Sequence, residues 1–269
     1  DGFAYILDGE PFMTEWAPKR SWKTTDTTAT ETGFGVSLDG RPVRTPAKAV
    51  LSVPNEAVAA RIAAEFDAQI EKIDPNTMPY TRTANAAIDK VSIQHAAVAD
   101  MLAEYGDSDL LCYRADSPDE LVQRQSDNWD PLLDWAATAL DARLLPRVGV
   151  MHDPQNAQAL DELRNRVHAL GVFELTAFHD LVAISGSLAI GFAAKDAVKS
   201  AEDLWDISRV DEIWQQEQWG ADEEAQEMAE TYANLGIRRF IATRLDVARR
   251  YASLLTTAGS LDLAFCGVG

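Results

Sequence analysis

The pattern of apolar residues changes once along the chain, near residue 115, and this change limits the possible folds more than any other feature. In residues 34–43, apolar and small side chains alternate around an Asp39-Gly40 turn, which is typical of a β-hairpin. From Asn156 onward, apolar residues recur at helical spacing almost to the end of the chain. The sequence therefore predicts an α+β fold, in which an antiparallel β-sheet region with helices precedes an all-α part.

This change of pattern divides the chain into two expected domains. We expect an N-terminal α/β domain over residues 13–115 and a helical C-terminal domain over residues 116–260. Residues 1–12 precede Met13, which resembles a natural start, so we interpret them as a non-native leader. If Met13 is the start, we expect no organelle-targeting sequence.

Local signals predict the elements of the N-terminal domain. Residues 50–53 form a short apolar run that predicts a strand, and Asn55 is expected to cap the helix after it. Residues 110–113 are expected to supply a last buried strand to the same sheet. Four-residue spacing predicts the buried face of the helix after Asn55, namely Val58, Ile62, Phe66 and Ile70.

In the C-terminal domain, residues 117–120 (Ser-Pro-Asp-Glu) are typical of a capping box with proline at the first helical position. Pro131 is expected to kink or restart the helix that follows. Residues 181–194 form the most apolar window, which is shorter than the roughly 20 residues of a membrane span, so we expect a buried core helix. Core packing is also the favoured interpretation of Trp129, Trp135 and Trp205.

The charge balance excludes some classes of partner. Asp and Glu number 43 against 24 Lys and Arg, so the formal net charge is −19. Such a field repels nucleic acid and anionic membrane surfaces, and it favours a basic partner. Two cysteines, Cys112 and Cys266, are too few for a disulfide framework or a zinc site and suit a reducing compartment, although a single bridge stays open. We therefore expect no nucleic-acid partner and no membrane insertion.

Residues able to carry chemistry are few and scattered. None of the four histidines stands at a metal-ligand spacing, and no close glycine pair follows a strand as a phosphate loop does. We therefore expect no cofactor and no metal. The alternative to a binding protein is a small-molecule enzyme, in which His179, Asp180 and the acid pairs at residues 211–212 and 222–224 act in acid–base catalysis.

Residues 214–219 form the strongest candidate for contact with another protein. Trp214 and Trp219 are separated by glutamines and a glutamate on an expected polar helix. Tryptophan is enriched at protein–protein interfaces because its rigid ring buries a large area. For these two rings, contact with a partner and packing against a neighbouring helix are equally favoured.

Five segments of the sequence resemble one known family. They occur in order between about residues 16 and 230, so the resemblance covers most of the chain. The family is that of the ATP-synthase assembly chaperones named ATP-twelve, of mitochondria and α-proteobacteria, which serve the alpha subunit of the F-one catalytic head. The segments are residues 19–23, 38–46, 105–114, 129–135 and 215–220.

The resemblance implies a fold and a function. The family combines an N-terminal α/β region with a helical C-terminal domain, and its members are not enzymes. They bind the free alpha subunit before it pairs with beta, and they keep its exposed interface from aggregating. We accordingly expect a soluble, monomeric chaperone in the cytoplasm of a bacterium, or in the mitochondrial matrix if the source is eukaryotic.

The resemblance also implies a site. The family's functional carboxylate falls on Glu212, judged by its spacing from Trp219, or on the neighbouring Asp211. Glu212, Gln215 and Trp219 are spaced by three and four residues, so on a helix they form one stripe. The expected protein-binding residues are Glu212, Gln215, Trp219, Trp214 and Asp211. Three positions depart from the family pattern, namely Phe66, Ser21 and Thr83.

Overall fold

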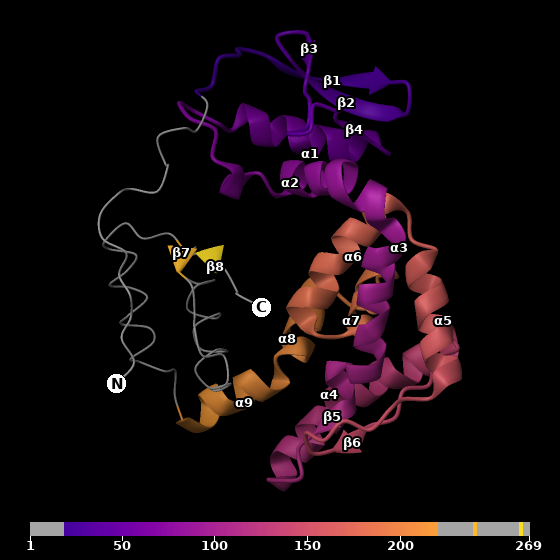
Figure 1. Cartoon of the computed structure of the whole chain (residues 1–269). Coiled ribbons are helices and arrows are strands. Elements are labelled where there is room, and N and C mark those ends of the chain that lie inside the picture. Colours follow the sequence, from indigo (N-terminus) through magenta and orange to yellow (C-terminus); the bar gives the residue numbers. More distant parts are fainter. Residues whose placement is uncertain (1–18, 220–238, 241–263, 266–269) are drawn as a thin grey trace, which may run out of the picture. The chain divides into compact units, whose positions relative to one another are not determined.

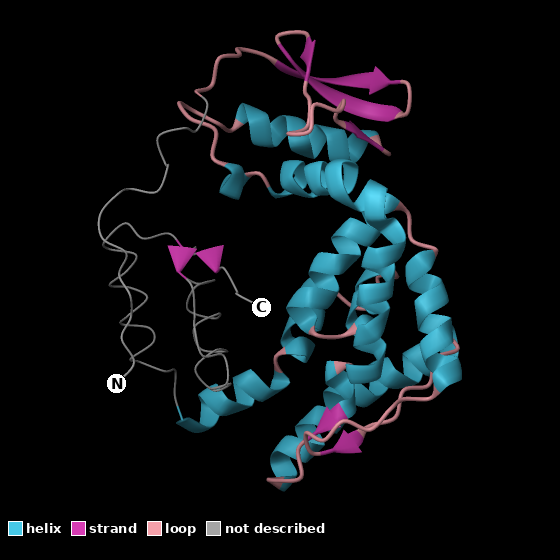
Figure 2. Ribbon diagram, viewed as in Figure 1, coloured by secondary structure: helices cyan, strands magenta, loops and turns pink. Residues whose placement is uncertain are grey.

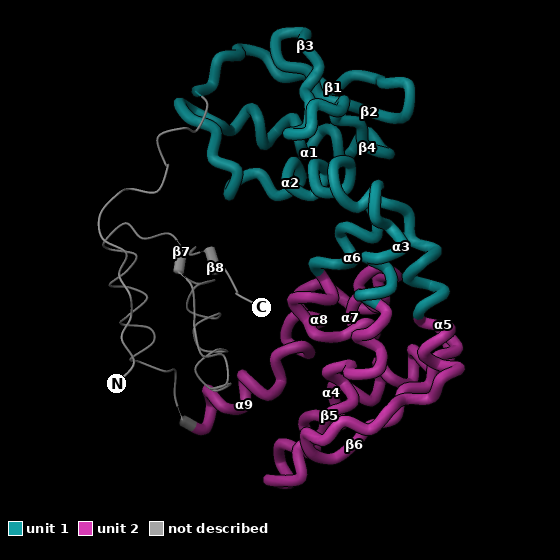
Figure 3. The backbone as a smooth tube through the Cα atoms, in the orientation of Figure 1, with its two compact units in different colours: residues 1–102, 164–180 teal, residues 103–163, 181–269 magenta. Residues whose placement is uncertain are grey.

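The structure of the protein is a computed structural model, which describes residues 19–219, 239–240 and 264–265. The chain forms two compact units, which are coloured separately in Figure 3. Unit 1 comprises residues 1–102 and 164–180, and unit 2 comprises residues 103–163 and 181–269.

The predicted fold class is confirmed. An antiparallel sheet with helices belongs to the N-terminal part of the chain, and helices dominate the rest (Figure 2). The predicted domain boundary at residue 115 stays a prediction. No helix among the described residues is long and apolar enough to cross a membrane.

The sheet of unit 1 is built around one central strand, β2. Strand β2 (Gly33–Leu38) pairs antiparallel with β1 (Thr25–Thr30), β3 (Arg41–Pro42) and β4 (Ser52–Val53) (Figure 1). The predicted hairpin turn is present, because Asp39 and Gly40 both adopt positive φ angles, of 48° and 76°. Only glycine fits at position 33, since a Cβ there would collide with the carbonyl oxygen of Val53.

Helix α1 (Glu56–Asp67) begins where the sequence predicts. The Asn55 side chain accepts a hydrogen bond from the backbone N–H of Val58 at 2.9 Å, as an N-cap does. Ile62 and Phe66 are buried against the sheet as predicted, in a core that includes Trp22, Val36, Leu51 and Val53. The assignment of Ile70 to this face is wrong, because α1 ends at Asp67 and the Ile70 side chain is 85% exposed.

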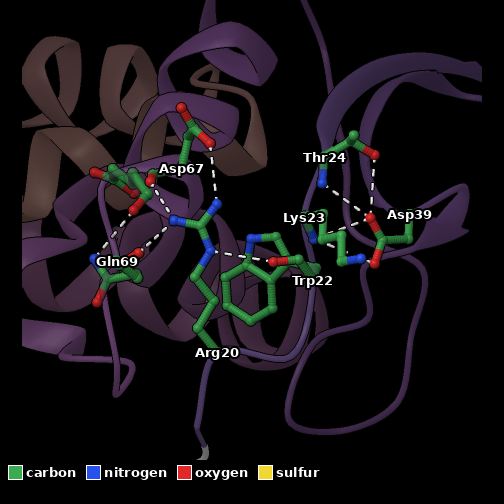
Figure 4. Close-up of polar contacts among 8 residues, drawn as sticks. Arg20, Trp22, Lys23, Thr24, Asp39, Asp67 and Gln69 are labelled. Atoms are coloured by element: carbon green, nitrogen blue, oxygen red, sulfur yellow. Dashed lines mark hydrogen bonds and ion pairs between the residues drawn. The ribbon is translucent and has the colours of Figure 1, made fainter.

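Segment 19–23 contacts the C-terminal end of α1, as Figure 4 shows. The Arg20 guanidinium donates to the carbonyl oxygens of Asp67 at 2.8 Å and Gln69 at 2.6 Å, where a cation complements the C-terminal end of a helix. Trp22 packs edge-on against Phe66, with ring centroids 5.7 Å apart. This motif therefore has a structural role in unit 1.

The Asp39 carboxylate makes a second connection to this segment (Figure 4). It accepts hydrogen bonds from the backbone N–H groups of Lys23 at 3.0 Å and Thr24 at 2.9 Å. These bonds, that of Thr24 first, lower the pKa of Asp39. The hairpin turn and the chain before β1 are thus joined.

The rest of unit 1 is helical. Pro75–Thr77 form the short helix η2, and α2 (Pro79–Ala86) continues into the π-helix η3 (Ala87–Val91) and α3 (Ser92–Ala103). The Glu65 carboxylate of α1 accepts hydrogen bonds from the N–H groups of Tyr80 at 2.7 Å and Thr81 at 2.8 Å, at the N-terminal end of α2. Residues 164–180 come from α5 (Ala157–His168) and α6 (Val172–Ser185).

The prediction that residues 110–113 add a strand to the N-terminal sheet is wrong. Leu110–Cys112 form a 3₁₀ turn, η5, and β5 (Tyr113–Arg114) pairs in parallel with β6 (Arg147–Val148) in unit 2. The Asp109 side chain accepts a hydrogen bond from the N–H of Leu111, which starts the turn and prevents an extended conformation.

Helix α4 (Asp119–Ala139) differs from its prediction at its start, and it does not restart at Pro131. Pro118 is its N-cap and not its first residue, and Ser117 donates to Asp116, so the predicted capping box is wrong. Pro131 lies inside an uninterrupted helix of 21 residues. Trp129 is buried as predicted, while Trp135 is half-buried.

The predicted core helix over residues 181–194 is two helices. Helix α6 ends at Ser185, Gly186 takes a φ of +69°, and Ser187 caps α7 (Leu188–Lys195) by accepting from the N–H of Ile190. Helix α7 is buried over most of its length, but Ile184 of α6 is 66% exposed. Helices α8 (Ala201–Ser208) and α9 (Val210–Trp219) follow, and a parallel pair joins β7 (Arg239–Phe240) to β8 (Ala264–Phe265).

A buried carboxylate, that of Asp109, lies between η4 (Glu104–Ser108) and η5 in unit 2. Asp109 is fully buried, and its carboxylate accepts from the N–H groups of Leu111 at 3.0 Å and Ala189 at 3.1 Å. It therefore holds the start of η5 against the start of α7. Burial raises the pKa of Asp109 to about 6, although these bonds oppose the shift.

Candidate functional site

Buried residues at the junction of α8 and α9 anchor the helix that carries the candidate face. Leu204 and Ile207 of α8 and Val210 of α9 are buried. The indole N–H of Trp129 on α4 donates to the carbonyl oxygen of Ile207 at 2.8 Å, which fixes the end of α8. The prediction that Trp205 belongs to this core is wrong, because its side chain is 46% exposed and stacks with the Arg209 guanidinium, 5.1 Å from the ring centroid.

One side of α9 contacts the first half of α4. The Arg124 guanidinium of α4 lies 5.1 Å from the centroid of the Trp214 ring and 2.8 Å from the Glu217 carboxylate. Trp214 and Glu217 are three residues apart and so project from the same side of α9. Of the two interpretations of Trp214, the structure shows packing against a neighbouring helix, with the ring half-buried.

Asp211 is also bound by a residue of α4. Its carboxylate accepts a hydrogen bond of 2.7 Å from the Gln125 side-chain amide, whose own oxygen accepts from the N–H of Ala115 at 2.8 Å. Gln125 is 2% exposed, so its amide has one favourable orientation, with the donor toward Asp211. Burial raises the pKa of Asp211, while the Gln125 bond and the charge of Arg114 lower it.

Glu212 and Gln215 lie one helical turn apart on the neighbouring side of α9, and both are half-buried. Burial raises the pKa of Glu212, opposed by its own backbone N–H and by Arg209. The structure shows no hydrogen bond from the Gln215 amide to another described residue. Trp219 is the last residue of α9, and its side chain lies outside the described part of the chain. The role of the five candidates in protein binding stays a prediction.

The sequence did not reveal the residues of α4 and β5 that hold this face in place. Arg124 and Gln125 reach α9 across 86 residues or more of chain, and no local pattern signals such a pair. Arg114 is 8% exposed, donates to Asp130 at 2.6 Å and lies 5.2 Å from the centroid of the Trp129 ring. Its position within the motif at residues 105–114 was the one available signal.

The predicted parts of the alternative enzymatic site are divided between the two units, and the acids at residues 222–224 lie outside the described residues. The His179 ring lies 3.2 Å from the Asp180 carboxylate, and both side chains are exposed to solvent. These residues belong to unit 1, whereas Asp211 and Glu212 belong to unit 2. Burial raises the pKa of Cys112 to about 12, which keeps the thiol protonated. Within the described ranges, no group of three or more His, Cys, Asp or Glu side chains could hold a metal ion.

Comparison with known proteins identifies the family of this chain. A family model described as "ATP12 chaperone protein" matches residues 19–137. The crystal structure of Atp12 from Paracoccus denitrificans is 43% identical in sequence, with a TM-score of 0.75 over 92% of this chain and 99% of that one. The chain belongs to the ATP12 chaperone family. The predicted resemblance is therefore confirmed.

Three further proteins are similar to this chain. An aspartate-to-lysine mutant of the P. denitrificans protein has a TM-score of 0.76 at 43% identity, over 92% of this chain and 97% of that one. A putative chaperone from Agrobacterium tumefaciens has a TM-score of 0.74 at 36% identity, covering 91% and 85%. The mitochondrial protein atp12 of Schizosaccharomyces pombe is 25% identical over 222 residues, or 78% of this chain and 76% of that protein.

Proposed function

We propose that this ATP12 protein is an assembly chaperone that binds the free alpha subunit of the catalytic head of an F-type ATP synthase. The observation that carries the proposal is the 43% identity to a solved Atp12 over nearly its whole length. An unassembled subunit exposes an apolar interface larger than a monomer normally tolerates. A chaperone that covers this interface until the beta subunit arrives lowers the concentration of the aggregation-prone form.

We propose that the side of α9 that carries Glu212 and Gln215 contacts the alpha subunit. Glu212 and Gln215 retain unused hydrogen-bonding capacity toward the other described residues, and an acid beside an amide suits a basic side chain of a partner. Trp219, at the next position of the stripe, would supply the apolar anchor. Asp211 and Trp214 support this side, because their contacts with Gln125 and Arg124 fix the rotation of the helix.

The remaining predictions are part of the same proposal. The protein acts as a monomer without catalysis, cofactor or metal, in the bacterial cytoplasm or the mitochondrial matrix. Its relatives include a bacterial and a mitochondrial protein, which supports these two locations. The division into domains at residues 13–115 and 116–260 also stays part of the proposal.

Co-expression with each ATP-synthase subunit tests the function. The tagged chain is expressed with alpha alone, with beta alone, and with the assembled catalytic head, and captured proteins are quantified. We expect soluble alpha to be recovered with the chain, and little beta or assembled head. Equal capture of alpha and beta, or capture of neither, would contradict the proposal.

A further inference from the structure

Unit 1 contains an open groove that the α9 face does not explain. Its volume is about 680 Å³, and it is lined by α2 and η3, by α3, and by residues 176–180 of α6. Helices α2, α3 and α6 can be followed in Figure 1. The residues that matter for its chemistry are Arg82, Ala86, Lys90, Ala97, Met101 and His179.

An irregular backbone separates two helical stripes that line this groove. At 100° per residue, residues 82, 86, 90, 97 and 101 of a straight α-helix would lie within about 100° of one another, on one side. The π-helix η3 takes more residues per turn, and Gln94 leaves helical conformation, with φ −128° and ψ 33°. Residues of both stripes line the groove. π-Helical turns are frequent at functional sites, which makes this irregularity informative.

The π-helix is held in place from the side of the sheet. Asp89 accepts hydrogen bonds from the Thr45 hydroxyl at 2.6 Å and from the N–H of Ala47 at 3.0 Å. Thr45 is 4% exposed, so this support is well packed. The groove wall that includes Lys90 is therefore built into unit 1.

The walls of the groove suit a helix as occupant. Ala86 and Ala97 are small and let another backbone approach closely, while Val98 and the exposed Met101 supply apolar contact. Stripes at three- and four-residue spacing on both walls match the spacing of anchors on an amphipathic helix. Helix-in-groove recognition uses this arrangement.

The charged residues that line the groove favour an occupant with negative charge. Arg82 and Lys90 are exposed, and neither makes an ion pair with another described residue. The single acid of the lining, Asp180, lies 3.2 Å from His179. Cations therefore outnumber acids here, in a protein whose formal net charge is −19. The groove therefore favours a segment that bears carboxylates.

We propose that this groove binds an amphipathic helix of the client protein, with acidic residues beside its apolar stripe. The inference rests on the proposed chaperone function and adds a second contact, opposite in charge to the α9 face. The Arg82 and Lys90 side chains pair with carboxylates of the client helix, and its apolar stripe packs on Ala97, Val98 and Met101. Contacts of opposite sign require segments of opposite charge on the client.

A cross-link from the groove identifies its occupant. A photo-reactive amino acid replaces Met101 in the full chain, which is co-expressed with the alpha subunit, irradiated and analysed by mass spectrometry. We expect a linked client peptide with negative net charge and apolar residues spaced by three and four. Links to residues 220–238 of the chain itself, to a basic peptide, or to nothing while the client is captured would overturn the proposal.

Charge reversal provides the second measurement. Arg82→Glu with Lys90→Glu is expected to lower client capture at least tenfold. The control, Arg41→Glu with Arg61→Glu, makes the same change of charge at exposed positions on β3 and α1 and is expected to bind like wild type. Thermal melts of both variants show whether unit 1 stays folded.

The outcomes separate the two proposals. If the wild-type chain does not capture alpha, the proposed function fails, and the groove proposal fails with it. If the wild type captures alpha and the two double variants capture it equally, only the groove proposal fails. If Arg82→Glu with Lys90→Glu lowers the melting temperature, the Met101 cross-link decides, since it leaves both cations in place.

Discussion

Two acidic regions of unit 2 use their carboxylates differently. Asp109 of the 105–114 segment is fully buried, and each of its oxygens accepts a backbone N–H of the same chain. On α9, Asp211 accepts one bond from Gln125, and Glu212 beside it is half-buried with a raised pKa. Asp109 lies in a segment that carries the family resemblance, and α9 overlaps another, residues 215–220.

The difference teaches that a family motif need not be a binding site. A carboxylate whose bonds are all made inside the chain has no capacity left for a partner, so it contributes to stability. A carboxylate kept partly dehydrated with few bonds is poised to gain some when a partner arrives. Substitutions in the first region should therefore change unfolding, and substitutions in the second should change binding.

The largest effect is expected for Asp109→Ala. The change leaves the buried N–H groups of Leu111 and Ala189 without acceptors and opens a cavity, so we expect a loss of about 3–5 kcal/mol in the free energy of unfolding. Urea unfolding followed by circular dichroism measures it. The control, Asp161→Ala at an exposed position of α5, should lose less than about 0.5 kcal/mol. Similar losses in both variants would show that Asp109 does not hold η5 to α7.

The same carboxyl predicts a dependence on pH. Burial raises the folded-state pKa of Asp109 to about 6, above the ordinary value of 3.8, so between these pH values only the folded state holds the proton. This group's contribution to the free energy of unfolding is present below pH 3.8 and is lost as pH rises through about 6. The free-energy difference between wild type and Asp109→Asn should therefore grow by on the order of 2–3 kcal/mol from pH 7 to pH 4.

Urea titrations of both proteins at several pH values measure this difference. Asp161→Asn serves as the control and should keep a constant offset from wild type. A constant offset for Asp109→Asn as well would mean that the buried carboxyl does not titrate in this range.

A smaller effect is expected for Gly106→Ala in the same segment. A Cβ at this position would lie 3.2–3.3 Å from the side chains of Leu160, Leu163 and Leu188. Their ends must move slightly to admit it, which costs about 1–2 kcal/mol of unfolding free energy in a packed core. Gly171→Ala is the control, since its Cβ would meet only the Glu174 carboxylate at 3.4 Å. A gain in stability for Gly106→Ala would show that this core is loosely packed.

Local patterns predicted much of the fold. The Asp39-Gly40 hairpin, the Asn55 cap and the burial of Trp129 depend on turn chemistry and helical spacing, which neighbouring residues determine. The predictions for residues 110–113 and 181–194 were wrong because single side chains, Asp109 and Ser187, hydrogen-bond to nearby N–H groups and start new turns. An apolar run does not distinguish a strand, one helix or two helices in such a case.

The candidate site was less predictable. The resemblance indicated α9, and helical spacing placed Glu212 and Gln215 on one side of it. Spacing alone did not show that Trp214 stacks on Arg124 or that Asp211 bonds to Gln125, because these partners lie far away in the sequence. Nor did it predict the groove of unit 1, whose lining includes residues of a π-helical turn that has no sequence signature.

The smallest effect on stability, with a large effect on binding, is expected for Glu212→Lys. Glu212 is half-buried, and its side chain makes no hydrogen bond or ion pair with another described residue, so the loss in unfolding free energy should stay at about 0.5 kcal/mol. A lysine there would repel the basic partner expected at this face, and capture of the alpha subunit should be abolished. Pull-down and thermal melts measure the two effects separately.

Asp161→Lys makes the same change of charge elsewhere on unit 2 and should capture alpha like wild type. If Glu212→Lys also binds like wild type, the side of α9 that carries Glu212 and Gln215 is not the contact, and the groove of unit 1 is the candidate that remains among the described residues. If its melting temperature falls as far as that of Asp109→Ala, then Glu212 belongs with the buried carboxylates. The contrast between the two acidic regions would then disappear.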